Sequence, residues 1–276
     1  MTFSLHDSID PNAAFDRVDP GVFQAEMPRR TTGERAYILQ EKLRAPNVEG
    51  ILQRPRINEI LTRSIGQFPA TLISGRAGTG KTALVSSLTA ESAHISWYSV
   101  ESNDIDWPVF SQYFAASLAA GVSGRFQGAG PMLQGGLPHQ SDIAHFLLNC
   151  FSAAYSEPSR GPSLIILDDI HHVFDAVWFE DFFTLLIHSL PPDTHLLLLG
   201  RSKPPGPLWR LRSKQMLNVL DEKVIAFTED EAAALFEMMC LAPSGAKEAN
   251  DHCFGRISKL LEFAREQSAE LSPLLS

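Results

Sequence analysis

Residues 75–82 carry the feature that most restricts how this chain folds. They read Gly-Arg-Ala-Gly-Thr-Gly-Lys-Thr, which matches the pattern G-x-x-x-x-G-K-[ST] of a phosphate-binding loop, or P-loop. The glycines at 75, 78 and 80 let the backbone turn with its N–H groups facing a phosphate chain. An apolar run at 70–74 precedes the loop, and Leu84 and Leu88 follow it at helical spacing. Strand, loop and helix are the setting that this motif requires, and a glycine-rich turn between them is the alternative.

The chemistry of the motif indicates a nucleoside triphosphate with Mg²⁺ as its ligand. Lys81 is expected to reach the β- and γ-phosphates and the Thr82 hydroxyl to ligate Mg²⁺, while the following helix adds the positive end of its dipole. The predicted nucleotide-binding residues of the loop are Gly75, Arg76, Ala77, Gly78, Thr79, Gly80, Lys81, Thr82 and Ala83.

The composition is that of an ordinary water-soluble domain. The 276 residues are 44% hydrophobic and 20% charged, and the net charge is −9. This acidic balance argues against a broadly basic surface that coats nucleic acid, although a local basic patch remains open. The first residues lack the long apolar run of a signal peptide, and no run approaches the roughly 18 residues of a membrane helix. We therefore expect a cytoplasmic protein with no membrane segment.

Three cysteines, Cys150, Cys240 and Cys253, are widely spaced and odd in number. This arrangement does not fit a metal site or a disulfide framework. It predicts buried, reduced thiols.

From residue 70 onward, strand and helix patterns alternate, which is typical of an α/β fold with a three-layer parallel sheet. The expected strands are 70–74, 94–99, 163–168, 195–200 and one within 215–220. The expected helices are a short one within 53–61, then 82–88, 109–118, 141–155 and 179–190. A glycine-rich segment at 121–138 is expected to be a surface excursion.

We expect three parts along the chain. Residues 1–35 form an arm with little regular structure, which has no function of its own or folds against a partner. Residues 36–220 form a P-loop NTPase domain, and residues 221–276 form a small helical lid. The lid opens with a capping box at 228–231, in which the Thr228 hydroxyl and Glu231 cap the first turn of a helix.

Two carboxylates follow the buried strand predicted at 163–168. Asp168 at the strand tip is expected at the crevice where open α/β sheets bind ligands, and it would hold the Mg²⁺ shell. Asp169 is the candidate for orienting or deprotonating the attacking water. The alternative is a strand followed by a polar turn, but the P-loop some ninety residues earlier favours a catalytic site.

Other polar residues support weaker inferences. Arg201 ends a buried strand and is expected to face the γ-phosphate, with a surface arginine as the alternative. Adjacent His171 and His172 point different ways, so we expect no shared metal; His171 is placed near the nucleotide. A basic run at 201–214 is interpreted as phosphate sensing plus a solvated face rather than a DNA patch, since only Trp209 supplies an aromatic platform.

Several segments together resemble the ATPase module of the STAND class of P-loop regulators. The similarity is to the module that begins large ATP-dependent LuxR-type transcription activators of the maltose-regulon kind. The segments that carry it are 42–46, 54–57, 95–100, 167–171, 201–205, 208–212 and 226–232.

The resemblance implies a nucleotide-controlled switch with ATP or ADP as its ligand. ADP would hold a closed state, and ATP exchange would favour an open state that associates with itself or a protein partner. Arg54 would lie near the adenine and Arg201 near the γ-phosphate. Such regulators continue into a winged-helix region, a helical-repeat sensor and a DNA-binding helix-turn-helix. This chain ends at Ser276 with no helix-turn-helix pattern, so we do not carry over DNA binding or inducer sensing.

Three functions therefore follow from the sequence. The first is a slow ATPase that acts as a regulatory switch, with Lys81, Asp168, Asp169 and Arg201 in the hydrolysis site. The second is a nucleotide-binding interaction module with little or no hydrolysis, which docks a partner protein. The third is a motor-like ATPase loader on DNA, which the acidic net charge disfavours.

Overall fold

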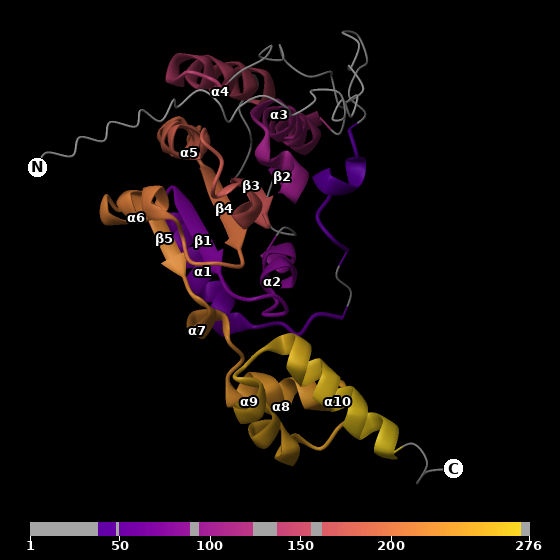
Figure 1. The fold of residues 1–276 in the computed structure, drawn as a ribbon. Coiled ribbons are helices and arrows are strands. Elements are labelled where there is room, and N and C mark those ends of the chain that lie inside the picture. The colour runs from indigo at the N-terminus through magenta and orange to yellow at the C-terminus, as the bar shows by residue number, and fades with distance from the viewer. Residues whose placement is uncertain (1–37, 48–49, 89–93, 124–136, 156–161, 272–276) are drawn as a thin grey trace, which may run out of the picture. The chain divides into compact units, whose positions relative to one another are not determined.

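A five-stranded sheet forms the centre of the protein. The structure is a computed structural model that describes residues 38–47, 50–88, 94–123, 137–155 and 162–271. The strands lie in the order β2-β3-β4-β1-β5, and every adjacent pair is parallel. They are β1 (Ala70–Ser74), β2 (His94–Ser99), β3 (Ser163–Asp168), β4 (Thr194–Gly200) and β5 (Leu217–Leu220) (Figure 1). Each lies where the sequence predicts a strand, and the α/β fold class is confirmed.

The helices connect and cover these strands. They are α1 (Pro55–Gln67), α2 (Lys81–Leu88), α3 (Trp107–Ser123), α4 (Gln140–Ala154), α5 (Phe179–His188), α6 (Gly206–Ser213), α7 (Glu222–Ile225), α8 (Glu229–Met238), α9 (Ala246–Cys253) and α10 (Ile257–Leu271). Short 3-10 turns form η1 (Gln40–Leu43), η3 (Ser102–Ile105), η4 (Ile170–Val173) and η5 (Pro243–Gly245). None of the helices in these described ranges is long and apolar enough to cross a membrane.

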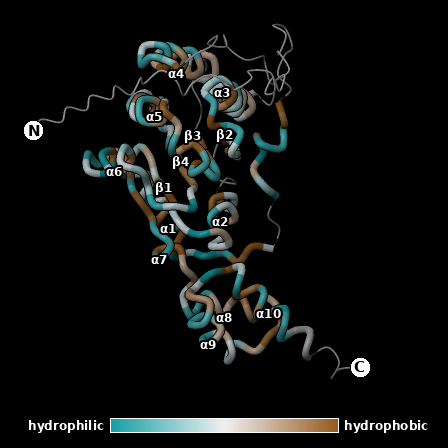
Figure 2. Tube along the Cα trace, viewed as in Figure 1, coloured by the Kyte–Doolittle hydropathy of each residue, from teal (hydrophilic) through white to brown (hydrophobic). Residues whose placement is uncertain are grey.

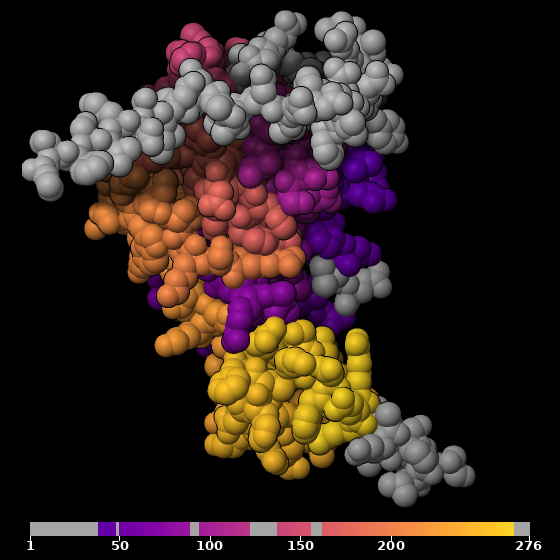
Figure 3. Space-filling model, viewed as in Figure 1, coloured from indigo at the N-terminus to yellow at the C-terminus, as the bar shows by residue number. Residues whose placement is uncertain are grey.

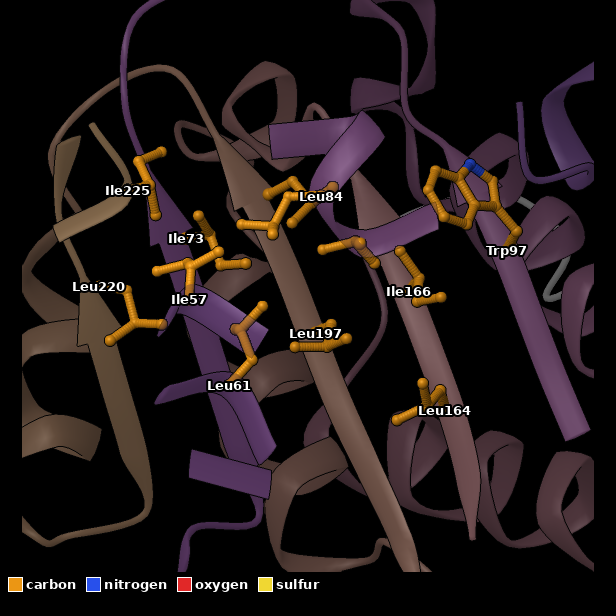
Figure 4. Packing of buried hydrophobic residues seen from close by; sticks show 12 residues of the cluster. Ile57, Leu61, Ile73, Leu84, Trp97, Leu164, Ile166, Leu197, Leu220 and Ile225 are labelled. Atoms are coloured by element: carbon orange, nitrogen blue, oxygen red, sulfur yellow. The ribbon is translucent and has the colours of Figure 1, made fainter. Parts of the chain in front are cut away.

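Helices lie on both faces of the sheet because the strands are apolar on both sides. Leu197 and Leu199 of β4 share one core with Ile57 of α1 and Leu84 of α2 (Figure 4). Successive side chains of a strand alternate between faces, so Leu196 and Leu198 point to the opposite face. There α3 and α5 with the turn before α5 contribute an aromatic cluster of Trp107, Phe110, Phe114, Trp178 and Phe182. The middle strands are accordingly coloured as hydrophobic in Figure 2.

The C-terminal helices have a core of their own. Phe227, Leu235, Phe236, Leu260 and other apolar residues of α8, α9 and α10 pack together. The predicted capping box is present: the Glu231 N–H donates to Thr228 Oγ1 at 3.3 Å, and the Thr228 N–H donates to Glu231 Oε2 at 3.0 Å. The carboxyl ends of the strands point toward this helical group (Figure 1). That orientation places the P-loop between the sheet and the lid.

Some expectations need correction, and others fall outside the described residues. Helix α3 reaches Ser123, so the expected excursion is helical at its start. A Cβ at Gly121 would lie 2.6 Å from the Ile95 carbonyl oxygen, which explains a glycine where α3 crosses β2. Cys240 is exposed, and Cys150 and Cys253 are only partly buried, so the expectation of three buried thiols is wrong. The arm at 1–35 and most of the glycine-rich segment (124–136) lie outside the described ranges.

A chain of buried hydrogen bonds crosses the sheet at the end opposite the P-loop. His195 Nδ1 lies 2.8 Å from the Phe68 carbonyl oxygen, which can only accept, so Nδ1 carries the proton. Nε2 of the neutral ring then accepts from Thr71 Oγ1 at 2.9 Å. Thr71 is 2.6 Å from Ser64 Oγ, which accepts from Asn218 Nδ2 at 2.8 Å. Burial lowers the pKa of His195 to about 4.

The buried hydrogen bonds around His195 predict that the free energy of unfolding falls as the pH is lowered. Because the folded pKa of about 4 lies below the unfolded value, the unfolded chain binds the extra proton, and stability is fully present above the unfolded pKa of about 6.5. The loss of unfolding free energy grows as the pH falls toward the folded pKa of His195, and it reaches about 3 kcal/mol. Urea unfolding at pH 7 and pH 5 measures it, with His195→Gln as the control that lacks the proton-binding ring. An equal pH dependence in both proteins would exclude His195 as the cause.

Candidate functional site

The P-loop leaves β1 at the carboxyl edge of the sheet. The Gly75 N–H donates to the Gly200 carbonyl oxygen at 3.1 Å, which ties the start of the loop to the end of the neighbouring strand β4. Gly78 and Gly80 have φ of 76° and 85°, a left-handed conformation that strongly favours glycine. Thr79 is buried, and its hydroxyl donates to the Arg76 carbonyl oxygen at 2.9 Å. These internal hydrogen bonds hold the loop in a defined shape.

Lys81 occupies the interior of this loop. Its side chain is only 6% exposed, and its Nζ donates to the carbonyl oxygens of Gly75 at 2.6 Å and Arg76 at 3.1 Å. Burial lowers the pKa of Lys81, and the neighbouring carboxylates Asp169 and Asp168 oppose that shift. A cation held by neutral carbonyls is positioned to transfer its hydrogen bonds to an anion that enters the loop.

Asp168 and Thr82 meet across the site. Asp168 ends β3, which is separated from β1 by β4 alone, and Thr82 lies in the first turn of α2. The Thr82 hydroxyl donates to Asp168 Oδ2 at 2.9 Å. Burial raises the pKa of Asp168, and the Thr82 hydrogen bond counteracts part of that rise. The sequence predicts both residues as metal ligands, and the fold brings them into direct contact.

Their chemistry fits Mg²⁺. A hydroxyl and a carboxylate are hard oxygen donors, and Mg²⁺ is commonly bound through one or two protein oxygens together with phosphate oxygens and water. Within the described ranges, no group of three or more His, Cys, Asp or Glu residues could hold a metal by itself. The donor set therefore suits a cation that arrives with a phosphate chain better than a metal bound by protein alone.

Asp169 and Arg201 form an ion pair beside these residues. Arg201 donates to the Asp169 carboxylate through Nη2 at 2.7 Å and through Nε at 3.0 Å. Asp169, the residue directly after β3, has φ 53°, which is a left-handed backbone conformation. The hydrogen bond to Asp169 is the main cause that raises the pKa of Arg201. The two predicted catalytic residues thus face each other at the ends of β3 and β4.

The lid contacts the P-loop directly. The Ser258 N–H donates to the Gly78 carbonyl oxygen at 3.0 Å, and Arg256 Nη2 donates to the Ala77 carbonyl oxygen at 2.7 Å. On the other side of the loop, the Glu222 carboxylate binds the Arg76 guanidinium at 2.7 Å and its backbone N–H at 3.1 Å. The yellow atoms of the lid lie against purple atoms of the N-terminal part of the domain in Figure 3. The conformation of the loop is therefore coupled to the position of the lid.

Gly78→Ala is expected to break this lid contact. A Cβ at Gly78 would lie 2.2 Å from Ser258 Oγ, and the residue has φ 76°. We expect a loss of about 2 kcal/mol or more in unfolding free energy, because an L-residue in this region costs about 1–2 kcal/mol before any clash. Thermal unfolding measures it, with Gly66→Ala as the matched control, since a Cβ there meets nothing within 4 Å. Equal melting temperatures for the two variants would contradict the described packing.

Arg54 and Arg56 clamp the start of the lid. Arg54 Nη2 donates to the carbonyl oxygens of Ile225 at 2.9 Å and Ala226 at 3.0 Å, and Arg56 Nη1 donates to that of Val224 at 3.0 Å. Both guanidinium groups also bind Glu231, at 2.8 Å and 3.1 Å. The Arg54 guanidinium lies 4.0 Å from the centre of the Phe227 ring. These contacts fix the connection between the sheet and α8.

A cavity lies between α1, α2 and the lid. Its volume is about 210 Å³, and its walls are mostly apolar. The lining residues include Leu52, Arg54 and Asn58, then Gly80, Ala83, Leu84 and Ser87, and from the lid Phe227, Leu235, Met238, Ile257 and Leu261. Gly80 and Ala83 also belong to the predicted phosphate-binding segment. The cavity is therefore continuous with the loop, and Arg54, predicted beside the base, is one of its walls.

The remaining polar residues predicted from the sequence take less specific positions. His171 Nδ1 is 3.7 Å from Asp169 Oδ1. The centres of the His171 and His172 rings are 4.2 Å apart, so the expectation that these two side chains point different ways is wrong. Burial is the largest cause that lowers the pKa of His171, followed by the charge of His172. In the basic run, Arg210 pairs with Glu180, and Arg212 lies 4.9 Å from the Trp209 ring centre. These contacts fit a surface network.

Sequence reasoning missed the lid residues that touch the loop. Glu222, Arg256 and Ser258 lie outside every motif, more than 140 positions after their P-loop partners. Gly255 has φ 67°, and an added Cβ would lie 2.8 Å from the Phe227 backbone, so a tight turn leads into α10. The glycine at this position is the signal of that turn in the sequence. A pattern Gly-Arg-Ile before a helix, however, does not indicate which surface it approaches.

Comparison with known proteins supports a relationship to transcription regulators. The chain is 28% identical over 192 residues to the HTH-type transcriptional regulator MalT of Serratia proteamaculans, covering 69% of this chain and 20% of that protein. It is 26% identical over 219 residues to MalT of Yersinia pestis, covering 78% of this chain and 23% of that protein. The chain thus spans about a fifth of the length of these curated relatives. No protein-family model matches it.

The resemblance to solved structures is weaker. A Walker-type ATPase of Pyrococcus abyssi has a TM-score of 0.45 at 13% identity, covering 82% of this chain and 76% of that one. The ORC1 protein of Aeropyrum pernix, solved in complex with DNA, has a TM-score of 0.39 at 18% identity, covering 66% and 46%. The sequence relatives confirm the predicted resemblance to the LuxR-type ATP-binding regulators, because this chain is similar to MalT over 192 to 219 residues.

Proposed function

We propose that this chain is a P-loop ATPase module of the STAND type, which binds ATP or ADP with Mg²⁺ and acts as a regulatory switch in transcription or signalling. The observation that carries the proposal is the 2.9 Å contact between Thr82 and Asp168, which joins the phosphate-binding helix to the acidic strand tip. Around it, Lys81 supplies the cation for the β- and γ-phosphates. Gly75–Thr82 supplies the N–H groups, and the similarity to MalT supports a regulatory use.

Each residue has a role in this proposal. Thr82 and Asp168 would hold Mg²⁺, which when bound neutralises charge on the phosphate chain. Asp169 would orient or deprotonate the attacking water, and Arg201 would face the γ-phosphate once it leaves Asp169. Arg54, Gly80 and Ala83 would line the base site. The Asp169 carboxylate and the Arg201 guanidinium are hydrogen-bonded to each other. A γ-phosphate that attracts Arg201 would therefore also free Asp169 to bind water.

The lid supplies the switch. Ser258 and Arg256 hold the P-loop backbone, and the Arg54–Glu231 pair holds the connection to α8. A phosphate chain that reshapes the loop would change both lid contacts at once, because Gly78 and Ala77 belong to the loop and also accept hydrogen bonds from the lid. The closed arrangement would correspond to the ADP state. ATP would then favour an open state that binds a partner or a second copy.

Phosphate release from ATP, measured with Mg²⁺ and with EDTA in its place, tests the proposal. We expect slow, Mg²⁺-dependent turnover, which rises or falls when a candidate partner is added. Phosphate release that is independent of Mg²⁺ would contradict the assignment of Thr82 and Asp168. Turnover indistinguishable from buffer, with ATP still bound, would favour the second candidate.

That second candidate is a nucleotide-binding interaction module with little or no hydrolysis. The specific observation in its favour is the bidentate Arg201–Asp169 pair, because both oxygens of the Asp169 carboxylate already accept hydrogen bonds from Arg201 and are less available to a water molecule. In such a module, ATP or ADP would stabilise the lid against the sheet, and the partner would read the position of the lid.

A further inference from the structure

A buried ion pair joins the turns η1 and η3 at the outer edge of the sheet. Only 6% of Lys42 is exposed, and its Nζ donates to the two carboxylate oxygens of Asp104 at 2.8 Å and 2.6 Å. Asp104 is also buried. The Lys42 ammonium group lies 4.3 Å from the centre of the Tyr113 ring and 3.3 Å from a carboxylate oxygen of Glu101. Lysine and aspartate are almost never buried to this extent unless they are paired.

This pair is not explained by stability alone. Taking two charges out of water is costly, and apolar side chains of similar volume in their place are often neutral or stabilising. What a buried pair can add is a single defined arrangement of the segments that carry it. Lys42 and Asp104 are 62 positions apart, so their contact fixes η1 and η3 relative to each other. The turn η1 also packs against β2, beside which it is drawn in indigo in Figure 1.

The turn η3 lies directly beside the strand tip that carries Asp168. β2 is the outermost strand, and its last residue, Ser99, is in register with Asp168 of β3. The next residue, Val100, donates its N–H to the Asp168 carbonyl oxygen at 2.9 Å. Asp104 Oδ2 in turn accepts from the Glu101 N–H at 2.8 Å. The carboxylate of the buried pair therefore also holds the chain directly after Val100.

The same turn holds the chain that follows Asp169. η3 packs against η4, which begins at Ile170. The Ile105 carbonyl oxygen at the end of η3 accepts from Trp178 Nε1 at 2.9 Å. The two carboxylates proposed for the hydrolysis site are thus supported on their β2 side by η3, and η3 is anchored by the buried lysine.

We propose that Lys42 is a positioning residue of the hydrolysis site, which acts through Asp104 and η3 to keep the Asp168 carboxylate where it meets Thr82 and Mg²⁺. This inference rests on the proposed function, since it assumes that Mg²⁺ binds at Thr82 and Asp168. Lys42 acts through the backbone at the ends of β2 and β3, and not through contact with the nucleotide. Its loss should therefore weaken the contribution of the cation and leave the phosphate-binding loop intact.

The ATP dissociation constant of the full chain, measured by calorimetry in EDTA and in Mg²⁺, separates these two contributions. The ratio of the two constants is the gain that the cation provides. Lys42→Met is expected to lower this ratio about tenfold, because outer partners of metal ligands contribute about 10–100-fold to metal affinity. The dissociation constant in EDTA should remain that of wild type, since Lys81 and the loop are unchanged.

A second variant removes the effect of an unpaired charge on folding. Lys42→Met leaves the Asp104 carboxylate buried without its cation, which is strongly destabilising. Lys42→Met combined with Asp104→Leu removes both charges and should unfold at nearly the wild-type temperature, but it should show the same tenfold loss because the link to the Glu101 N–H is gone. Lys247→Met is the matched control: it removes an ammonium group from an exposed pair with Glu229 and should leave both constants unchanged.

The outcomes distinguish this inference from the proposed function. A wild-type ratio in the double variant overturns the positioning role of Lys42 and leaves the proposed function intact. Equal weakening of ATP in EDTA and in Mg²⁺ also overturns it, because that result would assign Lys42 a general structural role. If wild type fails to bind ATP, or binds it equally well in EDTA and in Mg²⁺, the proposed function fails, and the inference fails with it.

Discussion

Replacing Lys81 by alanine is expected to weaken the binding of ATP with Mg²⁺ about a thousandfold. Lys81 is 6% exposed and lies among the P-loop carbonyls, so its charge would meet the β- and γ-phosphates where water is excluded. Removing one partner of a buried, hydrogen-bonded charge pair costs about 2–5 kcal/mol, and about 4 kcal/mol is a thousandfold in the dissociation constant. Isothermal titration calorimetry gives the ATP dissociation constants of wild type and of Lys81→Ala.

Two further variants separate binding from folding. Lys81→Met keeps most of the aliphatic stem and should fail to bind ATP while unfolding at nearly the wild-type temperature. Lys247→Ala removes the same charge from an exposed site on the lid, where Lys247 pairs with Glu229, and should bind ATP as wild type does. Wild-type affinity in Lys81→Ala would show that the phosphates do not occupy this loop.

Asp169→Asn is expected to keep ATP bound and to slow hydrolysis about a thousandfold. A positioned general base contributes about 10²–10⁴ to a rate, and asparagine cannot accept the proton of the attacking water. Asparagine also tolerates the left-handed conformation at φ 53°, and its side-chain oxygen can still accept from Arg201. The change therefore tests the carboxylate with little effect on the fold.

The readout is phosphate release under single-turnover conditions, together with the ATP dissociation constant. Asp175→Asn is the matched control, because it neutralises an exposed aspartate six residues further on and should not change the rate. Turnover in Asp169→Asn that equals wild type would remove Asp169 from the chemistry. A lost affinity with an unchanged rate constant would assign it to binding instead.

The sheet was predictable because its strands are short apolar runs with buried side chains on both faces. The pattern at 163–168 and at 195–200 admits no amphipathic helix, and the turn residues around each run set its ends. Helix α6 escaped prediction because Pro204, Pro205 and Pro207 around Gly206 indicate a loop. Proline is well tolerated at the first turn of a helix, where its missing N–H has no partner to lose.

Part of the candidate site could be predicted from the sequence, and part could not. The loop and the two aspartates follow from local motifs, and the parallel order of β1, β4 and β3 is enough to bring Thr82 to Asp168. The partners of the loop from the lid do not follow, because Ser258 and Glu222 meet it only through the packing of α7 and α10.

Equilibrium binding of ATP to the intact wild-type chain tests the central claim most directly. With Mg²⁺ present, calorimetry should show one ATP bound per chain with a micromolar dissociation constant, which corresponds to a binding free energy of about −8 kcal/mol. Exchanging Mg²⁺ for EDTA should weaken that binding, because Thr82 and Asp168 lose the cation that links them to the phosphates. The absence of any heat or saturation at millimolar ATP with Mg²⁺ would contradict the assignment of residues 75–82 as a nucleotide site.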